Sequence, residues 1–200
     1  MRLLQAEIDA LKSDDDIGTI ICEVSGANYG SVPLAEGFLS ELRRLADEHN
    51  AVLIFDEVVT GFRLAYGGGQ EYFGVTPDIA AYGKIAGGGA SLGAVAGKAE
   101  IIDFADPARR GNGDYAQING TLHGNPLASA AGLATLMELR KPSFYDDLNA
   151  KADDLRKVLQ SAQQVVPNRL QVPKLNIPLQ HFSPISLVPN PLRESGLHQT

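Results

Sequence analysis

Two polar side chains that could act together follow apolar segments of the sequence. Asp56 comes directly after the apolar residues 51–55, and Lys84 follows Gly83 at the end of the segment 79–82. Desolvation beside an apolar segment raises the pKa of an acid unless a cation or a strong donor faces it. A desolvated lysine has a lowered pKa and is the usual amine for imine chemistry. The pair indicates a site in which Asp56 meets a positive group and Lys84 acts as an amine.

Glycine flanks this lysine on both sides, since Gly83 precedes it and a glycine triplet occupies 87–89, so the backbone could approach a ligand closely. Each feature also has an ordinary explanation. An aspartate after a strand is more often a cap or an ion-pair partner, a lone lysine is more often solvated, and a glycine triplet usually marks a turn. The ordered combination within 56–89 gives an imine-forming or phosphate-handling site equal weight with these explanations.

Alternating strands and helices are predicted around these residues. Segments 17–24 (IGTIICEV) and 51–55 (AVLIF) are apolar and rich in β-branched residues, as buried strands are, and the stripe between them at 38, 39, 42 and 45 predicts a helix. Further strands are expected at 79–82 and 92–96, and a helix rich in small residues at 125–140. Strand, helix, strand implies parallel pairing, and ligands bind outside the carboxyl ends of such strands.

Composition restricts the classes of partner. The 200 residues carry a net charge of -7, which gives no basic surface for nucleic acid or an anionic membrane. Cys22 is the one cysteine and the four histidines are scattered, so neither a disulfide nor a metal site is expected. Neither a signal peptide nor a membrane-spanning segment is predicted. We expect a cytoplasmic protein that binds small metabolites.

Four segments resemble the class III, fold-type-I pyridoxal-phosphate aminotransferases, and among them the glutamate-1-semialdehyde aminomutases. They are LIFDEVVTGFR (53–63), YFGVTPDIAAYGKIAGGG (72–89), LGAVAGK (92–98) and NGTLHGNPLASAAGLATL (119–136). The resemblance implies an α/β fold, with a three-layer, mostly parallel sheet forming part of a large domain over residues 1–160. It also implies a transaminase or aminomutase that uses pyridoxal 5′-phosphate and acts on an amino acid or amino-aldehyde.

Roles for individual residues follow from this resemblance. Lys84 would form the internal aldimine and shuttle a proton, Asp56 would pair with the pyridine nitrogen, and Val58 would pack on the ring. Gly120 and Thr121 would bind the cofactor phosphate across the interface of a homodimer.

The substrate side would be formed by Glu23, Asn28 and Tyr29, which align with the family's Glu-Pro and Gly-Asn loop. Val24 departs from the usual proline in that loop. The family's upstream half, with its phosphate-cradling turn, has no counterpart in the sequence. We therefore expect an internal fragment of a longer enzyme, and a truncated, catalytically inactive chain is the main alternative.

Proline density changes near the carboxyl end of the chain. Six of the eleven prolines lie in residues 161–200, so this tail is expected to be irregular.

Two other enzyme classes have weaker support. Gly89 to Gly93 matches the G-x-S-x-G elbow of serine hydrolases around Ser91, with Asp103, Asp106 and His123 following in order. The elbow needs a strand before the serine and a helix after it, whereas glycines precede Ser91 and a strand-like segment follows. Residues 93–98 fall one residue short of a phosphate-binding P-loop.

Overall fold

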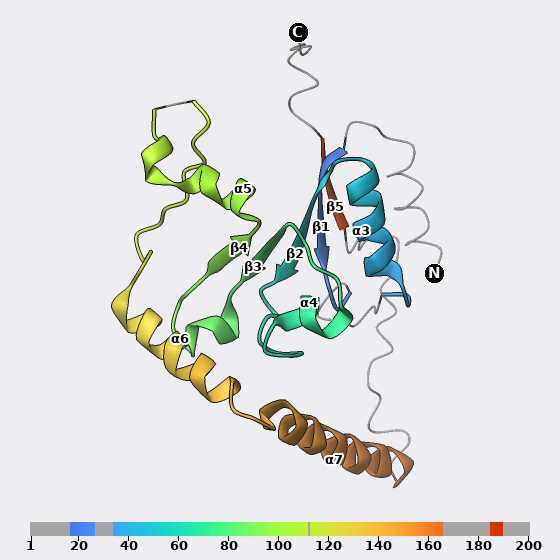
Figure 1. Cartoon of the computed structure of the whole chain (residues 1–200). Coiled ribbons are helices and arrows are strands. Elements are labelled where there is room, and N and C mark those ends of the chain that lie inside the picture. The colour runs from blue at the N-terminus through green and yellow to red at the C-terminus, as the bar shows by residue number, and fades with distance from the viewer. Residues whose placement is uncertain (1–16, 27–33, 112, 166–184, 190–200) are drawn as a thin grey trace.

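A five-stranded mixed sheet forms the centre of the computed structural model, which describes residues 17–26, 34–111, 113–165 and 185–189 (Figure 1). The strand order is β4-β3-β2-β1-β5. The three central strands run parallel, and they are β1 (Ile17–Glu23), β2 (Val52–Glu57) and β3 (Ile79–Tyr82). The edge strands β4 (Ala94–Gly97) and β5 (Ile185–Pro189) are antiparallel to their neighbours. The predicted α/β class and mostly parallel sheet are confirmed.

Helices connect and flank these strands. The α-helices are α3 (Phe38–Glu48), α4 (Gly68–Phe73), α5 (Ala99–Ile102), α6 (Pro126–Leu139) and α7 (Phe144–Val165), and the short 3-10 helices are η1 (Lys84–Gly87), η2 (Asp103–Ala105) and η3 (Pro107–Arg109). The Asn125 side chain caps α6 by accepting from the N–H groups of Leu127 and Ala128, and proline at the first helical position suits that start. No helix within the described ranges is long and apolar enough to cross a membrane.

One face of the sheet is packed against α3. The predicted stripe of Phe38, Leu39, Leu42 and Leu45 is buried, and it meets alternate strand residues in a single apolar core that includes Ile20, Cys22, Leu53 and Phe55. Burial alternates along β2, where Leu53, Phe55 and Glu57 are buried and Val52, Ile54 and Asp56 are half-buried. Because side chains alternate in direction along a strand, Asp56 lies on the more open face and Glu57 on the core face.

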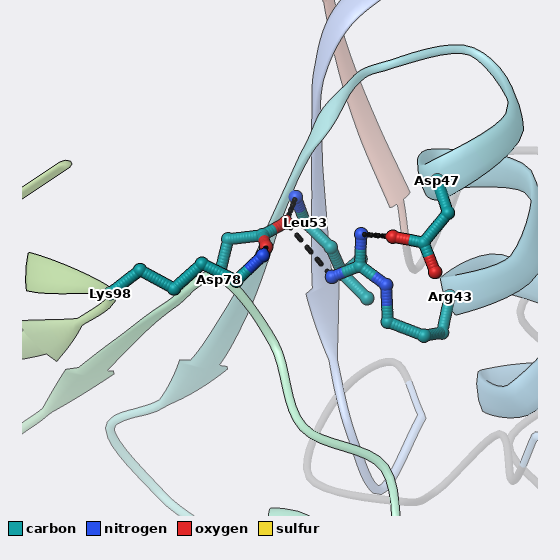
Figure 2. A network of polar contacts seen from close by, with 5 residues as sticks. All are labelled: Arg43, Asp47, Leu53, Asp78 and Lys98. Atoms are coloured by element: carbon teal, nitrogen blue, oxygen red, sulfur yellow. Dashed lines mark hydrogen bonds and ion pairs between the residues drawn. The ribbon is translucent and has the colours of Figure 1, made fainter. Parts of the chain in front are cut away.

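A charged network, shown in Figure 2, joins the strands around Asp78. Asp78 precedes β3 and Lys84 follows it, so the network lies at the end of β3 opposite to Lys84. The Asp78 carboxylate accepts from the Leu53 N–H at 2.7 Å and from Arg43 at 2.8 Å, and it pairs with Lys98 at 2.7 Å. Burial alone would raise the pKa of Asp78, but the hydrogen bonds from Lys98, the Leu53 N–H and Arg43 hold it below its ordinary value. Asp78 thus fixes the start of β3 against β2, β4 and α3.

The carboxyl-terminal tail differs from its predicted irregular structure in two places. Helix α7 continues to Val165, and residues 185–189 form β5 against β1. This short segment contains Ile185, Leu187 and Val188, and it lies at the edge of the sheet, where proline does not interrupt a ladder on both sides. Local apolar character therefore outweighed proline density within these five residues.

Candidate active site

A cavity of about 200 Å³ opens at the carboxyl ends of the three parallel strands. Its lining includes Glu23 from the end of β1, Asp56 from β2 and Lys84 just beyond β3, and it is completed by Ser25, Val58, Val59 and Thr60. The structure therefore brings together four residues that the sequence singled out, namely Glu23, Asp56, Val58 and Lys84. Pairing of β1 with β2 sets Glu23 beside Asp56, and pairing of β2 with β3 sets Asp56 beside Ala81.

The Asp56 carboxylate is oriented by the turn that follows β2. Its Oδ1 accepts a hydrogen bond from the Val58 N–H at 3.0 Å. The side chain is half-buried on the open face of the sheet, so its second oxygen has room to meet a ligand from the cavity. An acid placed in this way suits a cationic or N–H-bearing group.

Lys84 begins η1 in a left-handed backbone conformation, with φ of 47°. Such a conformation costs a non-glycine residue roughly 1–3 kcal/mol and is found mainly where the surroundings impose it. Gly83 allows the chain to pass close to Val58, since a Cβ at Gly83 would lie 3.3 Å from Val58 Cγ1. Lys84, which follows Gly83, is therefore held close to the turn that follows Asp56, where the ends of β2 and β3 pack together.

Helix α6 holds the segment that follows Lys84. A Cβ at Gly132 would lie 2.3 Å from the Ala86 carbonyl oxygen, and one at Gly88 would lie 2.4 Å from the Ala131 carbonyl oxygen. Glycine at these two positions lets α6 and η1 approach more closely than any side chain allows. This confirms the predicted close-packing helix of small residues and shows what it packs against.

Glu57 is a buried residue that the sequence did not single out as functional. It is 0% exposed, and its carboxylate accepts from the Thr60 hydroxyl at 2.9 Å, the Gly69 N–H at 2.6 Å and the Gln70 N–H at 3.2 Å. Burial first, and then the negative charge of Glu57, raises the pKa of Tyr82. The alternation of side chains along β2 was the available signal, because it sends two adjacent acids to opposite faces.

Gly120 and Thr121 do not line the cavity. Both are exposed in the segment before α6, and a Cβ at Gly120 would meet nothing within 4 Å. The predicted substrate-side residues Asn28 and Tyr29 lie outside the residues that the structure describes.

A larger cavity of about 540 Å³ lies away from Lys84, between α3 and the edge of the sheet. Its lining includes Arg43 and Lys98, whose charges already pair with Asp78. The smaller cavity is the stronger candidate because it contains both the acid and the lysine.

Neither competing enzyme class fits the described backbone. Coil and then β4 follow Ser91, where a nucleophile elbow needs a helix, and η1 precedes it instead of a strand. The P-loop-like segment is mostly the strand β4. Within the described ranges no three His, Cys, Asp or Glu side chains are grouped as metal ligands would be.

Residues 2–174 match the aminotransferase class-III family. The chain belongs to this family. It is 51% identical over 144 residues to the glutamate-1-semialdehyde 2,1-aminomutase of Desulforamulus reducens, covering 72% of this chain and 32% of that protein. It is 52% identical over 134 residues to glutamate-1-semialdehyde 2,1-aminomutase 2 of Brevibacillus brevis, covering 67% of this chain and 30% of that protein.

Solved transaminase structures share the fold of this chain. An omega-transaminase from Sphaerobacter thermophilus superimposes with a TM-score of 0.64 and 35% identity, over 74% of this chain and 33% of that one. A structure titled "Transaminase with PLP bound" gives a TM-score of 0.71 and 26% identity, over 80% and 37% of the two chains. The chain spans about a third of the length of the relatives that it matches.

Proposed function

We propose that this chain carries the cofactor-binding core of a pyridoxal-phosphate transaminase or aminomutase, with Asp56 and Lys84 as its central pair. The proposal depends on one observation, that both side chains and Val58 line the same cavity. The donor set suits the cofactor. An acid suits a protonated ring nitrogen, a primary amine suits an aldehyde, and an apolar side chain suits the face of an aromatic ring.

Pyridoxal phosphate, when bound, supplies an electron sink, and the protein supplies orientation and charge. Asp56 would accept a charge-assisted hydrogen bond from the ring nitrogen and keep it protonated. Lys84 would hold the cofactor covalently through Nζ and then move a proton with the same atom. Val58 would restrain the ring against the turn after β2.

The substrate in this proposal is a small amino compound, an amino acid or an amino-aldehyde. The role of Glu23 as an acid on the substrate side is supported by its position, because it lines the same cavity beside Asp56. Aminomutases and transaminases both occur among the similar proteins. The cytoplasmic location expected from the sequence belongs to the same proposal, and fractionation of cells that produce the chain would test it.

We also infer that the assembled enzyme is a homodimer. Gly120 and Thr121 are exposed and outside their own chain's cavity, as residues that serve a partner's cofactor would be. On α6, the apolar side chains of Leu127, Leu133 and Met137 are 76%, 62% and 66% exposed, which suits an interface core.

Sedimentation velocity tests the dimer. The wild-type chain should show a species of twice the monomer mass that Leu133→Glu abolishes, whereas Glu138→Gln, a polar change on the same helix, should leave it intact. A monomer at all concentrations, or a dimer that persists in Leu133→Glu, would contradict the assembly.

Equilibrium dialysis tests the function. The folded full chain is mixed with pyridoxal phosphate, and Lys84→Ala is compared with Lys141→Ala, which removes an exposed lysine paired with Glu138. We expect retention of about one cofactor per chain in the wild type and in Lys141→Ala, and lower retention in Lys84→Ala. The inactive-fragment alternative instead predicts a folded chain that retains no cofactor.

A further inference from the structure

Glu57 has no exposed surface, although a carboxylate is costly to bury. It follows Asp56 directly, but it faces the core between β2 and α4, on the opposite side of the sheet from the open face. The three hydrogen bonds from Thr60, Gly69 and Gln70 offset its desolvation. Three donors on a buried acid indicate a structural anchor.

The start of α4 is shaped to receive this carboxylate. Gly68 has φ of +73°, and a Cβ there would lie 2.6 Å from Glu57 Oε2. At Gly69 a Cβ would lie 2.3 Å from Val24 Cγ2. Glycine at both positions lets the α4 backbone reach the acid, so the loop between β2 and α4 is closed onto the strand through Glu57.

The same carboxylate also restrains the turn that orients Asp56. Thr60 donates its hydroxyl to Glu57, and the Gly61 N–H bonds to the Glu57 carbonyl at 2.9 Å, which closes the turn over 57–61. Within this turn lies Val58, whose N–H donates to Asp56. The contacts form a continuous path from the buried acid to the acid in the cavity.

We propose that Glu57 is a positioning residue: through Thr60 it holds the turn whose Val58 N–H orients Asp56. This inference rests on the proposed function only in taking Asp56 as the group that meets the cofactor. The two adjacent acids then have separate tasks. Asp56 faces the ligand, and Glu57 fixes the wall of the cavity formed by Val58, Val59 and Thr60.

Amide hydrogen exchange on the cofactor-free full chain tests the path, read by NMR at Val58 and Gly69. Glu57→Gln keeps the size of the side chain but presents an amide NH₂ group to one of the backbone donors. Loss of a hydrogen bond to a charged acceptor should speed exchange by about tenfold or more at Gly69. Exchange at Val58, whose N–H still has Asp56 as its acceptor, should also become faster because Glu57 no longer restrains the turn. The control is Glu71→Gln, the same change at an exposed carboxylate that accepts from the Gly67 N–H in the same loop. This control variant should leave the exchange rate of the Val58 amide unchanged.

A second pair of variants keeps the test decisive if Glu57→Gln does not fold. Thr60→Ser retains the hydroxyl and should retain slow exchange at Val58. Thr60→Val removes the hydroxyl, so the Val58 amide should exchange faster. Faster exchange at Gly69 with unchanged exchange at Val58 in Glu57→Gln, or equal Val58 exchange in the two Thr60 variants, would overturn the proposal. Failure of the wild-type chain to retain pyridoxal phosphate would count against the proposed function alone, since the Val58 measurement needs no cofactor.

Discussion

Replacing Asp78 by asparagine removes the charge at the centre of the network that joins β2, β3, β4 and α3. The Asp78 side chain is 6% exposed, and the mutation leaves Arg43, which is 20% exposed, beside a neutral amide. Loss of one partner from a buried pair costs roughly 3–5 kcal/mol, and the half-exposed position of Lys98 reduces this toward about 3 kcal/mol. For a chain of this size, that corresponds to a fall in melting temperature of roughly 6–12 °C.

The pH dependence of the same variant follows from the lowered pKa of Asp78. A carboxylate whose folded pKa lies below its unfolded value stabilises the fold at pH above the unfolded value of about 3.9, and this stabilisation is lost as pH falls through the folded pKa. The difference in unfolding free energy between the wild type and Asp78→Asn should therefore be constant near neutral pH and shrink below about pH 4.

Urea unfolding followed by circular dichroism, repeated across this pH range, measures both effects. Asp47→Asn is the matched control, because Asp47 pairs with the same arginine at 2.6 Å but is 63% exposed. It should cost less than about 1 kcal/mol. Equal losses in the two variants, or an Asp78→Asn difference that persists unchanged at acid pH, would refute the reasoning.

Three further predictions concern the proposed cofactor site. Gly132→Ala places a Cβ 2.3 Å from the Ala86 carbonyl and should cost about 1–3 kcal/mol in urea unfolding, with Glu138→Gln, an exposed position of α6, as a neutral control. Thr121→Ala should weaken cofactor retention in equilibrium dialysis without changing the melting temperature; unchanged retention would remove Thr121 from the site. Asp56→Asn should still retain the cofactor but lower turnover by roughly 10²–10³ fold in a transamination assay, because the ring nitrogen loses its ionic partner, and near-normal turnover would contradict that role.

Much of the architecture could be predicted from the sequence, because the strands and α3 are strongly patterned. The apolar runs that end at Asp56 and Tyr82 predicted parallel strands, and parallel strands place their carboxyl ends together. That rule alone put Asp56 and Lys84 at one edge of the sheet, and the resemblance to class III aminotransferases added their chemical roles.

Contacts between distant segments could not be predicted in the same way. The role of Asp78 depends on donors 25 and 35 residues away, Leu53 and Arg43, and nothing local to the sequence around 78 indicates that they meet there. The close packing of η1 against α6, through Gly88 and Gly132, likewise joins segments that are distant in the sequence. Strand β5 depends on an edge of β1 that a local reading of proline density does not reveal.

Lys84 is the amine that we propose binds the cofactor, and borohydride trapping tests this assignment. The folded chain is incubated with pyridoxal phosphate, reduced and digested, and the modified lysine is located by mass spectrometry. We expect the added mass on Lys84 and a lower yield of this product in Asp56→Ala, with Asp47→Ala as the control. Labelling spread over exposed lysines such as Lys141 and Lys157, with none concentrated on Lys84, would contradict it.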